Sequence, residues 1–301
     1  MGAVQSDSTQ LSRRAIIGLL CETNDSEDPL FERSKRPLIA LIAGAALATA
    51  AAATQVPAQA AAPHAPAEAS TAAAAAAPGP AKFERWATIS KTSKGYYYDA
   101  GQQDTHLVIT RVEGGVRLAD THTDVLRSKP DACRKKRARV GSGVVCRVPA
   151  TVDAGHPMTL KVFTRLGDDY IDSSTLSAAF ELYMLADAGH DVIRAGAGND
   201  FVNGAQDGDR AWGGAGNDWI RTGLGNDRIW GGPGRDRLVG VYARDWIDGG
   251  KSNDRVGGGG GDDRLFAGEG TDFVLCGTGR NTVHAERADR IMRDCEFVDY
   301  G

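Results

Sequence analysis

A nine-residue repeat constrains this 301-residue chain more than any other feature. Eleven units follow one another without an insertion from residue 186 to residue 284, and GGAGNDWIR at residues 213–221 is typical of them. The sixth position is Asp or, once, Asn, and the eighth is a branched aliphatic residue with one exception, Ala211. Such a unit cannot bury an apolar face alone, so the repeats must stack on one another.

The period gives each unit a turn and a short strand. The first six residues can turn sharply, because their Gly residues tolerate a positive φ and let backbone carbonyls converge. The last three form a strand whose central side chain faces inward, and two units make one coil, so turns on one edge recur every 18 residues. The predicted inward column is Ile193, Val202, Ala211, Ile220, Ile229, Leu238, Ile247, Val256, Leu265, Val274 and Val283.

The carboxylates at the sixth position indicate a metal. Stacked turns bring an Asp carboxylate close to backbone carbonyls of neighbouring turns, and Ca²⁺ takes six to eight oxygen ligands at about 2.3 to 2.6 Å. A single Gly-x-Asp is typical of an ordinary turn, but ten Asp at one spacing indicate several calcium sites. The predicted ligands are Asp191, Asp200, Asp209, Asp218, Asp227, Asp236, Asp245, Asp254, Asp263 and Asp272.

The glycines of the same turns are predicted to complete the metal sites by letting carbonyl oxygens approach the ion. No Cys or His takes a ligand position except Cys276, which opens the last unit, so softer metals are disfavoured. The glycines assigned to the sites are Gly196, Gly198, Gly213, Gly214, Gly216, Gly223, Gly225, Gly231, Gly232, Gly234, Gly249, Gly250, Gly258, Gly259, Gly261, Gly268 and Gly270.

The units resemble the nonapeptide repeat G-G-x-G-x-D-x-U-x of the hemolysin-type (RTX) calcium-binding family, where U is a large aliphatic residue. The resemblance covers residues 186–284 and implies an all-β protein whose C-terminal half is a parallel β-roll with several bound Ca²⁺ ions. With 15 acidic and 11 basic side chains, this segment carries a net charge of −4. It is less acidic than the family's usual roll, which implies lower calcium affinity.

The two edges of the roll are expected to differ. On the first edge, whose turns begin at residues 195, 213, 231, 249 and 267, only Ser252 replaces a Gly of the second or fourth position. On the second edge, Asp187, Ala205, Asp207, Val241 and Ala243 do so. Since the sites need carbonyls that converge, we expect the first edge to bind calcium more tightly.

Residues 1–60 are predicted to be a signal peptide with a long n-region. Residues 33–37 are basic, residues 38–53 are apolar, and residues 56–60 offer an A-x-A-type cleavage site. An uncleaved anchor and a twin-arginine signal at Arg13-Arg14 are the alternatives, but the apolar run is short for a membrane span. We therefore expect a secreted, extracellular protein with no stable membrane span after processing. Family members exported by type I machinery usually lack such a signal, which favours a Sec-type route.

Downstream of the signal peptide, residues 61–82 are rich in Ala and Pro and are expected to form a linker. Residues 83–163 alternate polar and apolar side chains and are predicted to form a small antiparallel β domain. Its expected strands are residues 88–92, 96–99, 106–112, 116–119, 143–148 and 159–164. Residues 164–284 are assigned to the roll, with the out-of-phase unit 167–172 as its first rung, and residues 285–301 to a C-terminal cap.

The Cys count indicates two disulfides. Cleavage near Ala60 removes Cys21 and leaves four Cys, for which we predict the pairs Cys133–Cys146 and Cys276–Cys295. The first closes a loop of about 14 residues, worth on the order of 3 kcal/mol. The second would hold the tail over the last rung and cover an open sheet edge. The basic run 134–139 either contacts an anionic cell envelope or, as we prefer, is a solvated loop.

Three functions are consistent with these features. The preferred one is a secreted structural or binding module that folds on calcium, and an adhesin or envelope protein that binds an anionic cell-surface glycan is the alternative. A secreted hydrolase is disfavoured, because the sequence contains neither H-E-x-x-H nor G-x-S-x-G. We predict no enzyme, and the net charge of −4 gives no indication of a nucleic-acid partner.

The seventh position of the repeat supplies a candidate glycan surface. Trp219 and Trp246 there could serve as platforms for sugar rings. The alternative, which we prefer, is a solvated strand face whose Arg stems cover the sheet. The basic residues concerned are Arg210, Arg228, Arg237, Arg255 and Arg264.

Overall fold

A computed structural model describes residues 86–101, 104–123, 125–136 and 140–301, and every regular element in these residues is a β-strand. The predicted signal peptide and linker lie outside the described residues. Over the described ranges there is no helix long and apolar enough to cross a membrane. The strands are β1 Trp86–Lys91, β2 Gly95–Ala100, β3 His106–Val112, β4 Gly115–Asp120, β5 Val125–Ser128, β6 Cys133–Lys135, β7 Ser142–Arg147, β8 Met158–Phe163, β9 Tyr170–Asp172, β10 Phe180–Leu185, β11 Val192–Arg194, β12 Phe201–Ala205, β13 Arg210–Trp212, β14 Trp219–Leu224, β15 Arg228–Pro233, β16 Arg237–Tyr242, β17 Trp246–Lys251, β18 Arg255–Gly260, β19 Arg264–Phe266, β20 Phe273–Thr278, β21 Thr282–Ala285, β22 Arg290–Ile291 and β23 Phe297–Tyr300.

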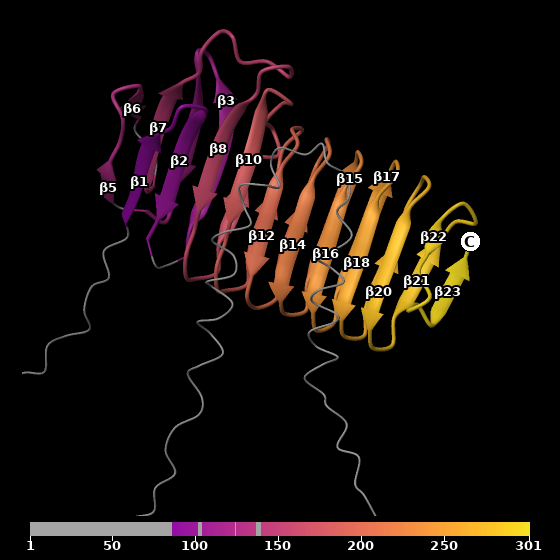
Figure 1. The fold of residues 1–301 in the computed structure, drawn as a ribbon. Helices are drawn as coiled ribbons and strands as arrows, with labels where there is room; N and C mark the ends of the chain where they lie inside the picture. Colours follow the sequence, from indigo (N-terminus) through magenta and orange to yellow (C-terminus); the bar gives the residue numbers. More distant parts are fainter. Residues whose placement is uncertain (1–85, 102–103, 124, 137–139) are drawn as a thin grey trace, which may run out of the picture. The chain divides into compact units, whose positions relative to one another are not determined.

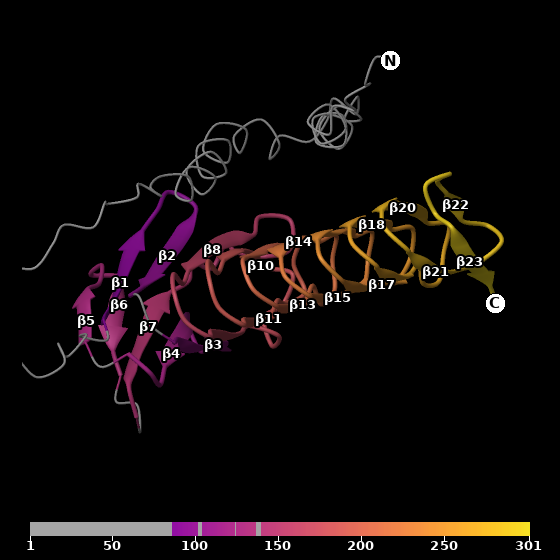
Figure 2. The ribbon, with the colours of Figure 1, turned by 90° about the horizontal axis from the view of Figure 1, so that it is seen from below.

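The strands form two sheets that face each other across the roll (Figures 1 and 2). Sheet A has the order β22-β20-β18-β16-β14-β12-β10-β8-β2-β1-β5, and sheet B has the order β23-β21-β19-β17-β15-β13-β11-β9-β3-β4-β7-β6. Consecutive strands of the roll alternate between the sheets and each pairs in parallel with the strand one coil away, as in Ile193 beside Ala211 and Val202 beside Ile220. The predicted 18-residue coil and parallel β-roll are therefore confirmed.

The eighth-position column forms the core of the roll. Every residue of the predicted column, from Ile193 to Val283, is at most 1 % exposed. Each strand contributes one such side chain, and burying an aliphatic side chain of this size stabilises a fold by roughly 1.5–3 kcal/mol. The column needs stacked neighbours to be buried at all, which explains why the repeats cannot fold singly.

Antiparallel strands precede the roll, but the boundary differs from the prediction. The pairs β1–β2, β3–β4, β4–β7 and β6–β7 are antiparallel. Residues 159–164 were predicted to complete this antiparallel part, and that prediction is wrong, because β8 pairs in parallel with both β2 and β10. On the other sheet, β3 pairs in parallel with β9. Both sheets are therefore continuous from the antiparallel strands into the roll.

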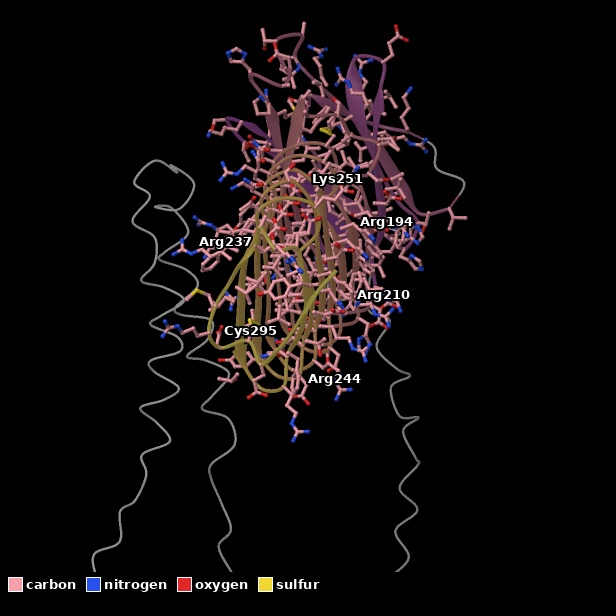
Figure 3. All side chains as sticks on the ribbon, turned by 90° about the vertical axis from the view of Figure 1, so that its right-hand side faces the viewer. Arg194, Arg210, Arg237, Arg244, Lys251 and Cys295 are labelled. Atoms are coloured by element: carbon pink, nitrogen blue, oxygen red, sulfur yellow. A yellow bond between two sulfur atoms is a disulfide. The ribbon has the colours of Figure 1, made fainter. Side chains whose placement is uncertain are left out.

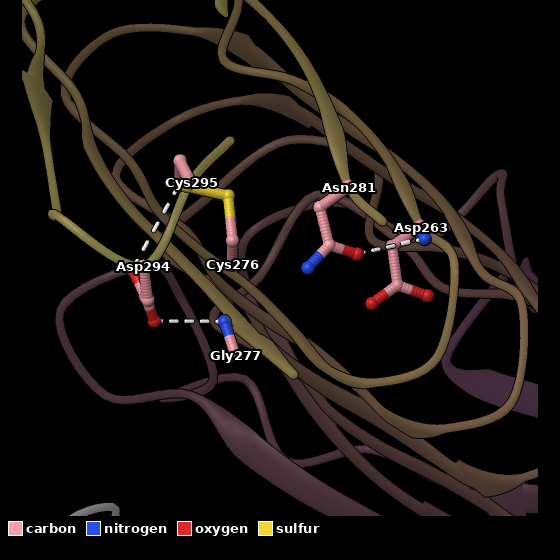
Figure 4. Close-up of a disulfide and its surroundings, with 6 residues drawn as sticks. All are labelled: Asp263, Cys276, Gly277, Asn281, Asp294 and Cys295. Atoms are coloured by element: carbon pink, nitrogen blue, oxygen red, sulfur yellow. Dashed lines mark hydrogen bonds between the residues drawn. A yellow bond between two sulfur atoms is a disulfide. The ribbon is translucent and has the colours of Figure 1, made fainter. Parts of the chain in front are cut away.

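The C-terminal residues add a last coil. Strand β22 pairs in parallel with β20, and β23 with β21, so the tail continues both sheets. The disulfide Cys276–Cys295 ties this coil to the preceding one, next to a hydrogen bond from Gly277 N–H to Asp294 Oδ2 at 2.8 Å (Figure 4). The second predicted pair, Cys133–Cys146, joins the neighbouring strands β6 and β7. Both predicted disulfides are confirmed.

Candidate metal centre

The glycines of the turns have two reasons to be glycine. Gly214 and Gly216 have φ of 101° and 115°, which only glycine adopts without strain. They also leave no room for a side chain, because a Cβ at Gly214 would lie 1.9 Å from the Gly196 carbonyl oxygen one coil earlier. Among the predicted second- and fourth-position glycines, only Gly196 and Gly198 lack a positive φ. The turns thus bring carbonyl oxygens of one coil against the backbone of the next.

The first-position glycines make room both for the carboxylates and for a carbonyl oxygen of the next coil. A Cβ at Gly213 would lie 2.3 Å from Oδ2 of Asp218, the sixth residue of the same unit. At Gly231, Gly249 and Gly258 the equivalent distances are 2.5, 2.9 and 2.3 Å. Each Oδ2 therefore occupies the space that a side chain at the first position would take.

Five of the six substituted positions, all except Asp187, keep the positive φ of the glycine turns. Ala205 and Val241 at the second position have φ of 85° and 102°, and Asp207, Ala243 and Ser252 at the fourth have φ of 66°, 73° and 83°. The substitutions therefore leave the course of the turn unchanged and strain it. Non-glycine residues in this region cost of order 1–3 kcal/mol each.

The predicted aspartates lie in two rows, one on each edge. Asp200, Asp218, Asp236, Asp254 and Asp272 form the first row, and the other five form the second. All ten are buried, at most 3 % exposed. Within each row the backbone N–H of one Asp donates to Oδ1 of the Asp one coil later, at 2.7 to 3.0 Å. In each Asp that accepts such a bond, Oδ1 therefore pairs with the backbone of the preceding coil.

The other carboxylate oxygen, Oδ2, is unpaired in most of these Asp residues. In the part of the chain that the structure describes, Oδ2 has no hydrogen-bond partner in nine of the ten predicted ligands. The exception is Asp200, whose Oδ2 accepts the Gly196 N–H at 2.9 Å. Buried polar atoms without a partner are rare in folded proteins and each calls for an explanation, such as an ion.

The surroundings of these carboxyls disfavour their negative charge. Burial is the largest cause and raises the pKa of Asp209 and Asp218 to about 9 and that of Asp191, Asp245 and Asp254 to about 8. Neighbouring carboxyls of the row raise these pKa values further, whereas the backbone N–H donors lower them. A cation between the turns would reverse this balance.

The donor set fits a hard cation. Carboxylate and carbonyl oxygens surround the turns, and calcium accepts both kinds of ligand. Among the described residues no three His, Cys, Asp or Glu side chains come together as a metal-binding group. A metal here therefore needs backbone carbonyls, which a calcium site can use and a thiolate or imidazole site cannot.

Two carboxylates that sequence reasoning missed extend the rows. Asp169 N–H donates to Asp191 Oδ1 at 2.9 Å, and Asp272 N–H donates to Asp289 Oδ1 at 2.9 Å. Asp169 lies 22 residues before Asp191, and Asp289 lies 17 residues after Asp272, so neither obeys the spacing of 18. The second row ends at Asn281, whose Oδ1 accepts the Asp263 N–H.

The seventh-position arginines do not form one surface. Arg210, Arg228 and Arg264 lie on sheet B, whereas Arg237 and Arg255 lie on sheet A. Figure 3, seen from the C-terminal end of the roll, shows Arg237 on one side and Arg194 and Arg210 on the other. The five predicted side chains are therefore divided between opposite faces.

The tryptophans proposed as sugar platforms belong to aromatic stacks. Trp246 lies between Trp230 and Phe266, with ring centroids 5.0 and 5.2 Å away. Trp219 packs edge-on against Phe201 at 4.9 Å, with the Arg237 guanidinium 5.4 Å from its ring centroid. The rings contact one another along the roll axis, so the stacks contribute to the cohesion of the coils.

Comparison with known proteins agrees with this geometry. A family model described as the RTX calcium-binding nonapeptide repeat (4 copies) matches residues 183–211, 203–238 and 239–274. No curated protein and no solved structure matches the chain.

Proposed function

Because the chain is an RTX-type calcium-binding repeat protein, we propose that it is a calcium-dependent structural or binding module whose roll folds when the ions bind between its turns. The observation that supports this most is the set of buried Oδ2 atoms without a partner, which belongs to nine of the ten predicted ligands. Oδ2 of these Asp, together with carbonyl oxygens of the Gly-rich turns, would hold the ions. When bound, Ca²⁺ supplies the positive charge that lets neighbouring carboxylates ionise inside the roll.

The energies involved are large enough for calcium to control folding. If one site binds with a Kd near 10⁻⁴ M, as extracellular modules do, millimolar calcium stabilises the fold by about 1.4 kcal/mol. Five such sites contribute about 7 kcal/mol, comparable to the whole stability of a small domain. Without calcium, the uncompensated carboxyls and the strained turns would leave the roll largely unfolded.

The location we propose is extracellular, after secretion in the unfolded, calcium-free state. Two observations support it: RTX repeat proteins are generally secreted, and the two disulfides are consistent with an oxidising compartment. The role is proposed to be non-enzymatic. The adhesin or glycan-binding alternative gains no support from the arginines, because they lie on two opposite faces.

Circular dichroism of the full chain during a calcium titration tests the proposal. We expect the β-strand signal to appear cooperatively as calcium rises and to disappear on chelation. Magnesium at the same concentration is the control, because its stricter octahedral geometry suits these turns less well. An unchanged spectrum in excess chelator, or an equal response to magnesium, contradicts the proposal.

A further inference from the structure

Residues 164–172 form a turn and a strand that lie before the residues matched by the repeat model. Four additional residues, 173–176, put this segment out of phase with the nine-residue spacing, so the sequence predicts it as the first rung but assigns no calcium ligand to it. Strand β9 nevertheless pairs in parallel with β11, with Ile171 beside Ile193. The segment is therefore a coil of the roll in structure, although its spacing differs.

The turn of this coil has the hydrogen bonds of the later turns. Gly167 N–H donates to Ala188 O at 2.9 Å, and Ala188 N–H donates to Arg165 O at 3.1 Å. The corresponding bonds in the later turns, from Gly216 N–H to Pro233 O and from Ala215 N–H to Gly196 O, are both 3.0 Å. Gly167 also has a φ of 120°, close to the 115° of Gly216. The backbone thus repeats the conformation that surrounds the predicted ligands.

Asp169 occupies the ligand position of this turn. It is 2 % exposed, and its N–H donates to Asp191 Oδ1 at 2.9 Å, as in the rest of the row. Over the described residues, Oδ2 of Asp169 and Oδ2 of Asp191 both lack a hydrogen-bond partner. Two orphaned carboxylate oxygens in neighbouring turns are the arrangement found at every later step of the row.

We infer that the calcium row of the second edge begins one coil before the recognisable repeats, and that the carboxylates of Asp169 and Asp191, with backbone carbonyl oxygens of the turn at residues 164–167, hold a further calcium ion. The inference rests on the proposed function. It assigns a metal ligand to a turn whose sequence, TRLGDDYID, lacks the first two glycines of the repeat.

This site would connect calcium to the antiparallel strands. Asp169 Oδ1 accepts the Thr105 N–H at 2.6 Å, and Thr105 lies directly before β3. Strand β3 pairs with β9, placing Leu107 beside Ile171. An ion that fixes the Asp169 carboxylate therefore also fixes the start of β3, so calcium would order the junction between the antiparallel strands and the roll.

Calorimetric calcium titration of full-length variants tests the site. Asp169→Asn keeps the oxygen that accepts the Thr105 N–H and removes the charge, and we expect it to bind one ion fewer, or one ion at least ten-fold more weakly. Asp168→Asn is the matched control, because Asp168 is the exposed neighbour, and it should bind calcium as the wild type does. Asp209→Asn, in the recognisable repeats, should lose calcium as well.

The outcomes separate the two proposals. Unchanged calcium binding in Asp169→Asn, with a loss in Asp209→Asn, overturns the inference and leaves the proposed function intact. A wild-type chain that binds no calcium overturns both.

Hydrogen exchange of the wild type needs no substitution and covers the case in which Asp169→Asn does not fold. We expect calcium to slow exchange of residues 105–109 at least ten-fold, at the concentrations that protect residues 210–212. If residues 105–109 exchange at the same rate in calcium and in chelator while residues 210–212 respond, the further site does not exist.

Discussion

Single residues decide how much strain the turns carry. Val241 has a φ of 102° at a position where most other turns have Gly, and β-branched side chains tolerate this region least. The stack above and below holds the backbone in place, because β16 pairs with both β14 and β18. The strain is therefore stored in the folded state and can be removed by restoring glycine.

Val241→Gly is expected to stabilise the roll by about 1 kcal/mol, since the relief of strain exceeds the entropic cost of glycine, which is roughly 0.5–1 kcal/mol. Thermal unfolding at fixed calcium should show a midpoint higher by a few degrees. Val239→Gly on the same strand is the control, because Val239 has no positive φ and its substitution should lower the midpoint. A lower midpoint in both variants contradicts the strain argument.

At the scale of the turns and strands, the rows differ in their backbones rather than in their carboxyls. Asp218 and Asp227 both lie inside a row, both are buried, and both have an unpartnered Oδ2 among the described residues. The strained substitutions are unevenly divided, however, since only Ser252 lies on the first edge. A comparison of these two Asp therefore tests the backbone contribution.

We expect Asp218→Ala to remove more high-affinity calcium binding than Asp227→Ala, because the turns next to Asp218 keep their glycines and let carbonyls approach without strain. Calorimetric titration of the two variants measures the difference. A greater loss from Asp227→Ala would show that the second edge is the tighter row.

The sequence predicts the coils wherever the nine-residue spacing holds. The prediction is incomplete where parallel strand pairing continues although the repeat is interrupted. The inward column follows from the spacing and the two disulfides from the number and placement of the Cys residues, and all of them are confirmed. Strand β10 was missed because its coil has Leu182 at the ligand position, although Leu182 N–H still donates to Asp200 Oδ1. Asp169 and Asp289 were missed because loops absorb extra or missing residues. Parallel strands need only stack at about 4.8 Å, so pairing tolerates changes in loop length that a strict period does not.

For the whole molecule, the two rows make stability depend on protons when calcium is absent. Burial raises the pKa of the row carboxyls above the unfolded value of about 3.9, to about 6 for Asp236, Asp263 and Asp272 and to about 9 for Asp209 and Asp218. The folded, calcium-free roll therefore binds more protons than the unfolded chain over this range. Its stability is fully present below pH 4 and is lost as the pH rises through about 6 to 9.

Calcium should reverse this dependence, because it occupies the space between carboxylates that have lost their protons. We expect circular dichroism to show the calcium-free chain largely unfolded at pH 8 and more folded at pH 5, and we expect the apparent calcium affinity to increase from pH 5 to pH 8. Titrations at pH 7 in two buffers of different ionisation enthalpy would detect the released protons, since each ion displaces protons from the carboxyls that it contacts. Glu269→Gln is the control, because the Glu269 side chain is exposed on a turn of the first edge and its substitution should leave the proton release unchanged. A calcium-free chain that is more stable at pH 8 than at pH 5 would show that the row carboxyls are ionised without metal, and some other cation or solvent would then have to satisfy them.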